Sequence, residues 1–167
     1  MSKTQSVFTP VLLAIVLALT GAGCSKKSKQ ANIQARADAY FKSGEYDKAK
    51  IEYMNLLRSD NQNPTAFQQL GLIWYEQGSP LQAFPFLLKA RDLAPGNADV
   101  RTKLAYAFIA VGQWAEARKE AFAILEKSPG YDDAVILLAE TVQTKEDLDE
   151  TAKRLEEMKK ERETAAV

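Results

Sequence analysis

Cys24 is the only cysteine of the 167-residue sequence, and it is the residue best placed for covalent chemistry. It follows the small residues 21–23 and a largely apolar run at 7–19, with Lys3 before that run. A charged start, an apolar stretch and a small-residue zone are the three regions of a secretory signal. The apolar segment spans only 11–23, whereas a membrane-spanning helix needs about 20 residues. Cleavage after residue 23 is therefore favoured over membrane spanning.

Other covalent or metal chemistry has no support in the composition. The sequence has no histidine, so it lacks Ser/His/Asp and Cys/His nucleophile pairs and histidine metal sites. Phosphate-binding and calcium-binding loop motifs are also absent. The carboxylate pairs Asp132–Asp133 and Glu156–Glu157 are adjacent residues, which point in different directions on a helix. We predict no enzyme activity, no metal, no cofactor and no small-molecule substrate. The formal net charge of zero argues against nucleic acid as a partner.

Residues 20–24, Thr-Gly-Ala-Gly-Cys, resemble the lipobox of bacterial lipoprotein signals. The resemblance implies that a diacylglyceryl group is attached to the Cys24 sulfur and that cleavage leaves Cys24 as an acylated amino terminus. Gly21 departs from the large aliphatic residue that is usual there, and Lys26, Lys27 and Lys29 would resist translocation. An uncleaved anchor and an ordinary signal peptide remain alternatives. Ser25 favours sorting to the outer membrane, so we expect a lipid-anchored protein of the bacterial cell envelope that faces the periplasm.

The rest of the sequence repeats itself with a period of 34 residues. Gly44, Gly78 and Gly112 share this spacing, and three further series keep it. These are Ala49, Ala83 and Ala117; Leu70, Leu104 and Leu138; and Tyr40, Trp74 and Phe108.

The best unit resembles the tetratricopeptide (TPR) pattern at Phe67, Leu70, Gly71, Trp74, Gly78, Ala83, Leu87, Ala90 and Pro95. The first unit departs from the pattern at Arg36 and Asn61, and the fourth lacks the glycine. The resemblance covers roughly residues 30–160. It implies an all-α fold, a solenoid of about four antiparallel helix pairs preceded by a signal peptide. The domains expected are a signal peptide at 1–23, a flexible tether at 24–31, the solenoid at 32–162 and a disordered tail at 163–167.

The physical pattern agrees with helix pairs. Phe67, Leu70, Gly71 and Trp74 share one helix face, and Ser79-Pro80 is typical of a helix start. We expect Pro85 to cause only a mild kink and Trp114 to be buried in an interface between repeats. The helices are predicted at 32–43 and 46–59, 64–77 and 80–93, 98–111 and 114–127, and 132–143 and 146–162.

The last predicted helix is strongly charged and leaves a narrow apolar stripe at Leu148, Ala152, Leu155 and Met158. Such a stripe can seal the stack while the charges face water, as expected of a terminal capping helix. The alternatives are a helix that pairs with another chain and a position inside a longer repeat array.

In the first helix of each pair, the face opposite the core is the candidate groove for a partner. It mixes aromatic, aliphatic and amide groups, which suit a peptide or a partner's helix. The alternative is that its aromatic residues pack against neighbouring helices. The chaperone-tail-binding subclass of the TPR family needs Lys, Arg and Asn there, whereas this sequence has Gln34, Asp38, Gln68 and Asp99. The predicted groove residues are Gln34, Asp38, Phe41, Gln68, Leu72, Tyr75, Thr102, Tyr106, Ile109, Ile136 and Glu140.

Function is therefore predicted as a scaffold or adaptor that binds other envelope proteins through peptide or helix segments and the membrane through Cys24. The sequence resembles TPR lipoproteins that serve outer-membrane assembly, pilus or secretion machinery, or polysaccharide export. A self-associating structural spacer, an enzyme accessory unit and the N-terminal part of a longer TPR array are the alternatives.

Overall fold

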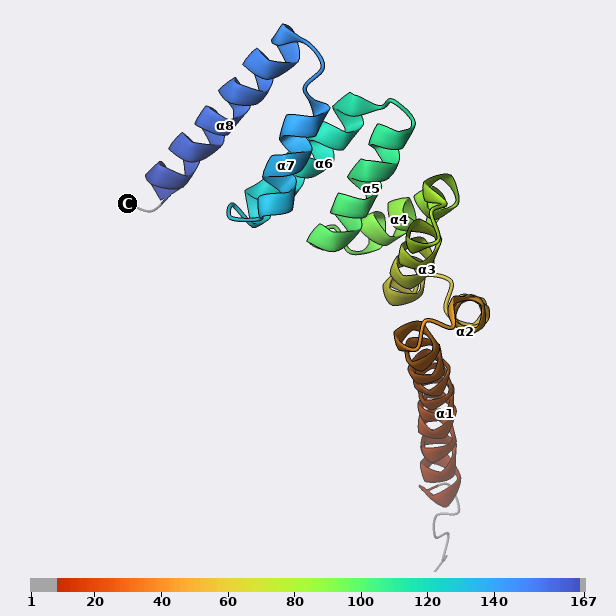
Figure 1. The fold of residues 1–167 in the computed structure, drawn as a ribbon. Coiled ribbons are helices and arrows are strands. Elements are labelled where there is room, and N and C mark those ends of the chain that lie inside the picture. The colour runs from red at the N-terminus through yellow and green to blue at the C-terminus, as the bar shows by residue number, and fades with distance from the viewer. Residues whose placement is uncertain (1–8, 166–167) are drawn as a thin grey trace, which may run out of the picture. The chain divides into compact units, whose positions relative to one another are not determined.

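The computed structural model describes the backbone of residues 9–165 and the side chains of residues 26–164 (Figure 1). Every regular element among these residues is a helix, which confirms the predicted all-α class. The helices are α1 (Thr9–Lys42), α2 (Tyr46–Ser59), α3 (Pro64–Glu76), α4 (Pro80–Leu93), α5 (Ala98–Ala110), α6 (Trp114–Lys127), α7 (Asp132–Thr141) and α8 (Lys145–Ala165). The chain divides into unit 1, Met1–Asn61, and unit 2, Gln62–Val167.

The two ends of the chain differ from the predicted helix limits. Helix α1 already includes residues 26–31, for which the sequence predicts a tether, and α8 continues to Ala165. Lys, Gln and Ala favour helix, and no Gly or Pro interrupts residues 25–31. The Cys24 side chain and residues 1–8 lie outside the described residues, so lipidation and the signal peptide stay predictions. Among the helices that are described, none combines the length and apolarity needed to cross a membrane.

A glycine turn joins the helices of the first three pairs. Gly44, Gly78 and Gly112 have φ values of +75°, +72° and +74°, a region that residues with a Cβ rarely adopt. At the second turn the Gly78 N–H donates to the Tyr75 carbonyl and the Ser79 N–H to the Trp74 carbonyl, both at 2.9 Å. The same two bonds recur at Gly44 and Gly112. They form a Schellman motif, which ends one helix and lets the next turn back.

Close approach of the two helices of a pair depends on small residues. A Cβ on Gly71 would lie 2.6 Å from Leu87 Cδ2, so α3 and α4 could not pack at this distance with a larger residue there. Ala83 and Ala117, at equivalent places in α4 and α6, are fully buried. The repeated small residues are therefore explained by helix packing.

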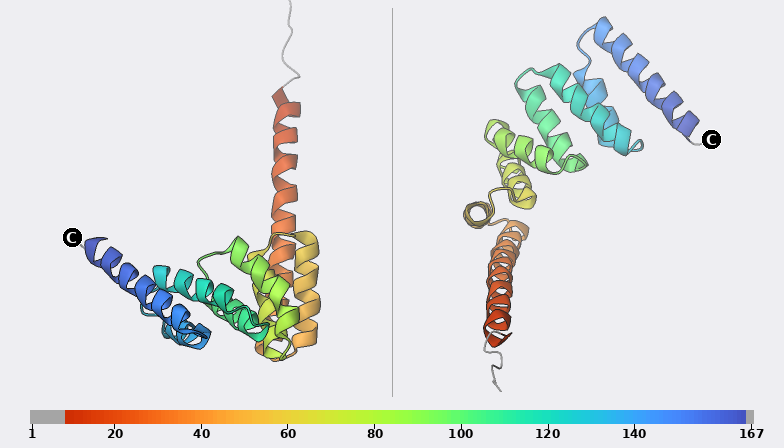
Figure 2. Two further views of the ribbon diagram at one scale, coloured as in Figure 1. Left: turned by 90° about the horizontal axis from the view of Figure 1, so that it is seen from above. Right: turned by 180° about the vertical axis from the view of Figure 1, so that it is seen from behind.

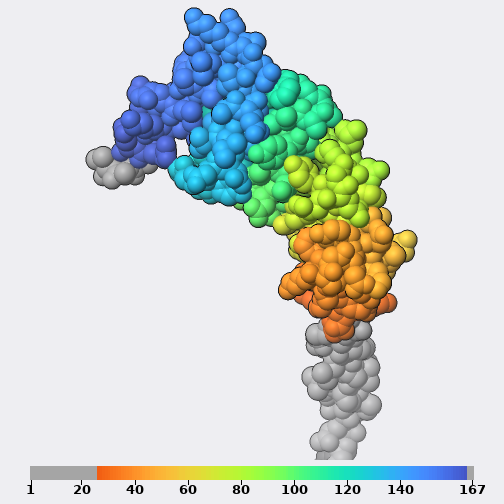
Figure 3. All heavy atoms as spheres, viewed as in Figure 1, coloured from red at the N-terminus to blue at the C-terminus, as the bar shows by residue number. Residues whose placement is uncertain are grey.

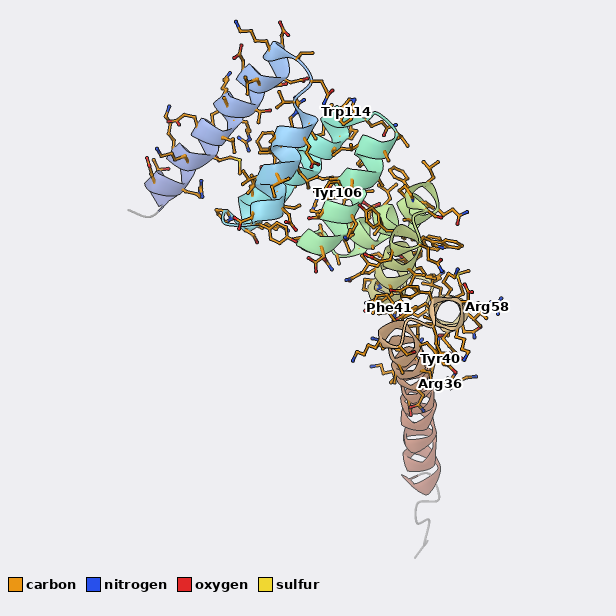
Figure 4. All side chains as sticks on the ribbon, in the orientation of Figure 1. Arg36, Tyr40, Phe41, Arg58, Tyr106 and Trp114 are labelled. Atoms are coloured by element: carbon orange, nitrogen blue, oxygen red, sulfur yellow. The ribbon has the colours of Figure 1, made fainter. Side chains whose placement is uncertain are left out.

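Unit 1 consists of α1 packed on α2. Its buried side chains include Ile33 and Ala37 of α1 and Tyr53 and Leu56 of α2. Figure 4 labels Arg36 and Arg58, which both line a hollow beside this packing.

Unit 2 has one continuous apolar core. It is built from α4, α5, α6 and α7, with Phe67, Trp74 and Tyr75 of α3 packed against it and Met158 of α8 included. Helix α5 contacts both α3 and α7, so the first helices of the three pairs form one layer. The views in Figure 2 show α5, α6 and α7 side by side.

Two ion-pair centres fix the helices of unit 2. The buried Glu120 of α6 accepts from Arg91 of α4 at 2.6 Å and from Arg101 of α5. The buried Arg118 of α6 donates to the Thr141 carbonyl at the end of α7 (2.8 Å) and pairs with Asp147 of α8 (2.7 Å). Removing one partner of such a buried pair leaves an uncompensated charge, so these contacts restrict how the helices can pack.

Helix α8 is rotated from the orientation that its apolar stripe predicts. Thr151 and Met158 are buried, whereas Leu148 and Leu155 are 54% and 39% exposed and Ala152 is also exposed. Only Met158 of the predicted stripe seals the core. The ion pairs Arg118–Asp147 and Arg154–Glu126 lie on the same side of α8 as Thr151 and Met158 and agree with this orientation. Figure 3 shows the atoms of α8 at the C-terminal edge of unit 2.

Two single-residue expectations have different outcomes. Helix α4 continues through Pro85, so the proline does not break it. Trp114, which we expect to be buried between repeats, is only half-buried and lies outside the core cluster. It is the first residue of α6, immediately after the glycine turn, and it lines a surface hollow with Gln143 and Asp147 (Figure 4).

Replacement of Gly112 by Ala tests the turn. Nothing lies within 4 Å of an added Cβ, so the cost is purely conformational, and we expect a loss of about 1–2 kcal/mol in the free energy of unfolding. Gly130 also has free space but no positive φ, so Gly130→Ala should change stability by less than about 0.5 kcal/mol. Equal effects of the two substitutions in urea unfolding would contradict the proposed role of the turn.

Truncation of two aromatic residues tests the core assignment. Phe108 is buried and stacks edge-on against Phe84 with ring centroids 5.0 Å apart, so Phe108→Ala should cost about 3–5 kcal/mol. Trp114→Ala should cost clearly less, because Trp114 keeps solvent contact. If denaturant unfolding showed that Trp114→Ala lowers the free energy of unfolding as much as Phe108→Ala does, Trp114 would belong to the core.

Candidate functional site

In unit 1, the predicted groove residues are Gln34, Asp38 and Phe41 of α1. The Tyr53 hydroxyl donates a hydrogen bond of 2.6 Å to Asp38. Burial and the Asp38 carboxylate raise the pKa of the Tyr53 phenol. The Phe41 ring lies 5.7 Å from the Tyr46 ring, and Gln34 is half-buried. Asp38 and Phe41 are thus held by contacts within unit 1.

In unit 2, the predicted groove residues lie on α3, α5 and α7, the helices that form one layer. We call this set the first-helix face. Their burial differs: Ile136 is 49% exposed and Glu140 is exposed, whereas Thr102 is only 5% exposed. Thr102 therefore lies beneath the surface, contrary to its predicted place in the groove. The set comprises Gln68, Leu72, Tyr75, Thr102, Tyr106, Ile109, Ile136 and Glu140.

Three of these side chains, Tyr75, Tyr106 and Glu140, come from α3, α5 and α7, and α5 contacts both other helices. Burial raises the pKa of the Tyr75 phenol, and the Glu76 and Glu140 carboxylates raise it further. Burial also raises the pKa of the Tyr106 phenol, with added effects from Glu140, Asp133 and the Tyr75 phenol. Glu140 of α7 therefore acts on a tyrosine of α3 and a tyrosine of α5. Figure 4 labels Tyr106 on α5, the middle helix of the three.

Tyr75, Tyr106 and Ile109 are half-buried and pack partly against the core cluster. The two interpretations of the aromatic residues, groove and interhelical packing, both describe part of their surface. Part of each of these side chains packs on the core, and part remains exposed to solvent.

A lysine that sequence reasoning missed lies over the first tyrosine. Lys103 Nζ is 4.7 Å from the centroid of the Tyr75 ring and 3.7 Å from Glu76 Oε1. Lys103 stands one residue after Thr102 and is half-buried, whereas Thr102 is buried beside Tyr131.

A third tyrosine was also missed. The Tyr131 hydroxyl donates to Asp99 Oδ1 of α5 at 3.0 Å. Burial raises the pKa of the Tyr131 phenol, the Thr102 hydroxyl lowers it, and Asp99 and Asp133 raise it. Tyr131 is the N-cap residue of α7, outside the helix, so helical periodicity could not reveal it. Asp133, in contrast, shares the i, i+3, i+7 face with Ile136 and Glu140, so helical spacing could have revealed Asp133 as a residue of this face.

One polar contact stabilises the start of the face. Asn97 Nδ2 donates to Gln68 Oε1 at 2.9 Å, and the Asn97 side chain also caps α5 by accepting from the Val100 N–H at 3.1 Å. Gln68 is thereby tied to the start of the neighbouring helix. Within the described residues, no group of three or more potential acidic, cysteine or histidine ligands could hold a metal ion.

A family model described as tetratricopeptide repeat matches residues 75–127, from the end of α3 through α6. Comparison with curated proteins gives no match. The second TPR domain of human RPAP3, in complex with an HSP70 peptide, superposes with a TM-score of 0.63 at 18% identity, covering 71% of this chain and 99% of that one.

Two further solved structures are similar. The first TPR domain of Spaghetti (RPAP3), bound to an HSP90 peptide, gives a TM-score of 0.62 at 22% identity and covers 68% of this chain and 90% of that one. The Yersinia enterocolitica type III secretion chaperone SycD, in complex with a peptide of the translocator YopD, superposes with a TM-score of 0.56 at 18% identity. It covers 81% of this chain and 95% of that one. The family match identifies a tetratricopeptide repeat at residues 75–127, and these structures confirm that the chain shares the fold of TPR domains, as the sequence pattern predicts.

Proposed function

We propose that this chain is a lipid-anchored adaptor of the bacterial envelope, which binds a peptide or helical segment of another protein on the first-helix face of unit 2. The observation that carries the proposal is that Tyr75 and Tyr106 are half-buried on neighbouring helices of one layer, and that Glu140 of the next helix in this layer raises the pKa of both phenols. Half-buried tyrosines that are rigidly supported from below are typical of the residues that dominate binding energy at protein interfaces.

The similar structures support a peptide as the ligand. The two RPAP3-type domains hold bound HSP70 and HSP90 peptides, and the Yersinia chaperone holds a bound translocator peptide. These proteins share the fold of this chain at low identity, so the inference is one of analogy. It extends to the mode of binding and leaves the partner to be identified.

The anchor is proposed from the sequence around Cys24. A lipid at Cys24 would hold the repeats at the membrane surface, facing the periplasm, and Ser25 favours the outer membrane. Each buried methylene contributes about 0.8 kcal/mol, so two or more acyl chains give stable attachment without a spanning helix. Envelope proteins are then the partners expected within reach of the first-helix face.

The double substitution Tyr75→Ala and Tyr106→Ala tests the binding face. Each truncation should weaken partner binding by about 2 kcal/mol, because an aromatic anchor is removed from the interface. Recovery of co-purifying proteins from envelope extracts should fall, while the loss of stability should remain below that of Phe108→Ala.

Phe122→Ala is the matched control for this test. Phe122 is also a half-buried aromatic residue packed on the core, but it belongs to α6, a second helix. The Phe122→Ala variant should be less stable than the wild-type chain but should still recover the same co-purifying proteins. If the double variant retained its full set of co-purifying proteins, the first-helix face would not be the binding site.

Substitution of Cys24 by Ser tests the anchor. The variant should take up no fatty-acid probe in a bacterial host and should remain an uncleaved precursor, because the acyl acceptor is missing. Ser25→Ala should still be labelled and processed. Absence of label on the wild-type chain, measured by gel fluorescence after probe coupling, would rule out the lipid anchor and leave the adaptor role to be judged separately.

A further inference from the structure

Three carboxylates on or beside the first-helix face of unit 2 have no cationic partner. Asp99 of α5 and Asp133 and Glu140 of α7 form no ion pair among the described residues. Elsewhere in unit 2 the acidic side chains that approach the core are compensated, as Glu120 is by Arg91 and Arg101. The exposed Glu146 and Asp149 of α8 also form no ion pair in the described part of the chain, so what distinguishes the three carboxylates of this face is their place beside half-buried tyrosines.

Lys103 of the same helix layer forms no ion pair with these carboxylates. Lys103 lies over the Tyr75 ring and pairs with Glu76 at 3.7 Å, so its charge is already matched by a carboxylate of α3. The remaining charge of the face is that of Asp99, Asp133 and Glu140. All three carry exposed side chains.

Three phenol rings lie among the carboxylates. Tyr131 donates to Asp99 at 3.0 Å, and Asp133 and Glu140 both act on Tyr106. The Tyr75 phenol contributes to the raised pKa of Tyr106, and Glu140 raises the pKa of both phenols. The rings are half-buried, so each presents part of its π surface beside at least one negative charge.

This combination matches the chemistry of a cationic side chain. Ammonium and guanidinium groups bind the faces of aromatic rings, and their hydrogen bonds to carboxylates are stronger than neutral ones. The Thr102 hydroxyl adds a further polar group: it lies beside Tyr131, buried, and makes no hydrogen bond of standard geometry. An acidic segment would instead place like charges together, which opposes association.

We propose that the first-helix face of unit 2 selects a segment that carries a lysine or arginine side chain, which inserts among Tyr75, Tyr106, Asp133 and Glu140. This inference rests on the proposed peptide-binding function and specifies its ligand class. It also distinguishes the chain from the RPAP3-type domains, whose bound peptides SRMEEVD and SGPTIEEVD are rich in acidic residues.

Selection from a library of random dodecapeptides displayed on phage tests the proposal on the purified full chain. The selected peptides should be enriched in Lys or Arg at one position relative to the unselected library. The paired substitution Asp133→Asn and Glu140→Gln should weaken binding of a selected peptide by about ten-fold or more, since two charge-assisted contacts are lost. Glu140→Lys should shift the selected residue at that position towards Asp or Glu.

The matched control is Glu146→Gln with Asp149→Asn. It makes the same change of charge at two exposed carboxylates of α8 that form no ion pair within the described chain, and it should leave peptide affinity unchanged. Unchanged thermal unfolding by circular dichroism shows that each variant is folded.

The outcomes separate the two proposals. One outcome would overturn the basic-ligand inference and leave the adaptor role intact. The wild-type chain would select peptides whose binding is lost in the Tyr75→Ala, Tyr106→Ala variant, but these peptides would show no basic enrichment or would bind the Asp133→Asn, Glu140→Gln variant normally. Failure of the wild-type chain to select any peptide would overturn both.

Discussion

The left-handed glycine turn is the constraint on which the rest of the structure depends. Gly44, Gly78 and Gly112 each end one helix with the same pair of hydrogen bonds, and each directs the next helix back along its predecessor. Because the interval is constant, small residues recur where helices cross closely, as Gly71 does against Leu87. Solenoids are stabilised by contacts between neighbouring repeats, so one local backbone geometry, repeated, determines which residues form the core and which form the first-helix face.

Charge is distributed differently between the interior and this face. Glu120 and Arg118 are buried and each has partners from at least two other helices, as required for ions removed from water. Asp99, Asp133 and Glu140 remain in contact with solvent, where a lone carboxylate is tolerated. The interior charges thus serve to fix helix positions, whereas the charges of the face add little to the fold.

The helix pairs were predictable because their causes are local: the glycine turns, the proline starts at Pro64 and Pro80 and the apolar spacing all stand within single repeats. The rotation of α8 was not, because it is decided by ion pairs between residues far apart in the sequence, Arg118 with Asp147 and Arg154 with Glu126. The candidate site was predicted in part. Tyr75, Tyr106 and Glu140 follow from helical periodicity. Thr102, which was assigned to the groove, is buried, and the neighbouring Lys103 is the residue that contacts Tyr75. Tyr131 precedes α7, and helical periodicity gives no information about a residue outside a helix.

Tyr75 has a second role that its backbone reveals. Its carbonyl accepts the Gly78 N–H, and the Ile109 carbonyl accepts the Gly112 N–H in the next repeat. The final turn of a helix often frays, but here the turn that carries the phenol is closed by the glycine motif. A segment that docks on the face then has to order side chains, at about 0.5–1.5 kcal/mol each, and not the backbone beneath them, which would cost about 1–2 kcal/mol per residue. The glycine that shapes the repeat also pre-organises its surface, so that even a short ligand can retain most of its interaction energy as affinity.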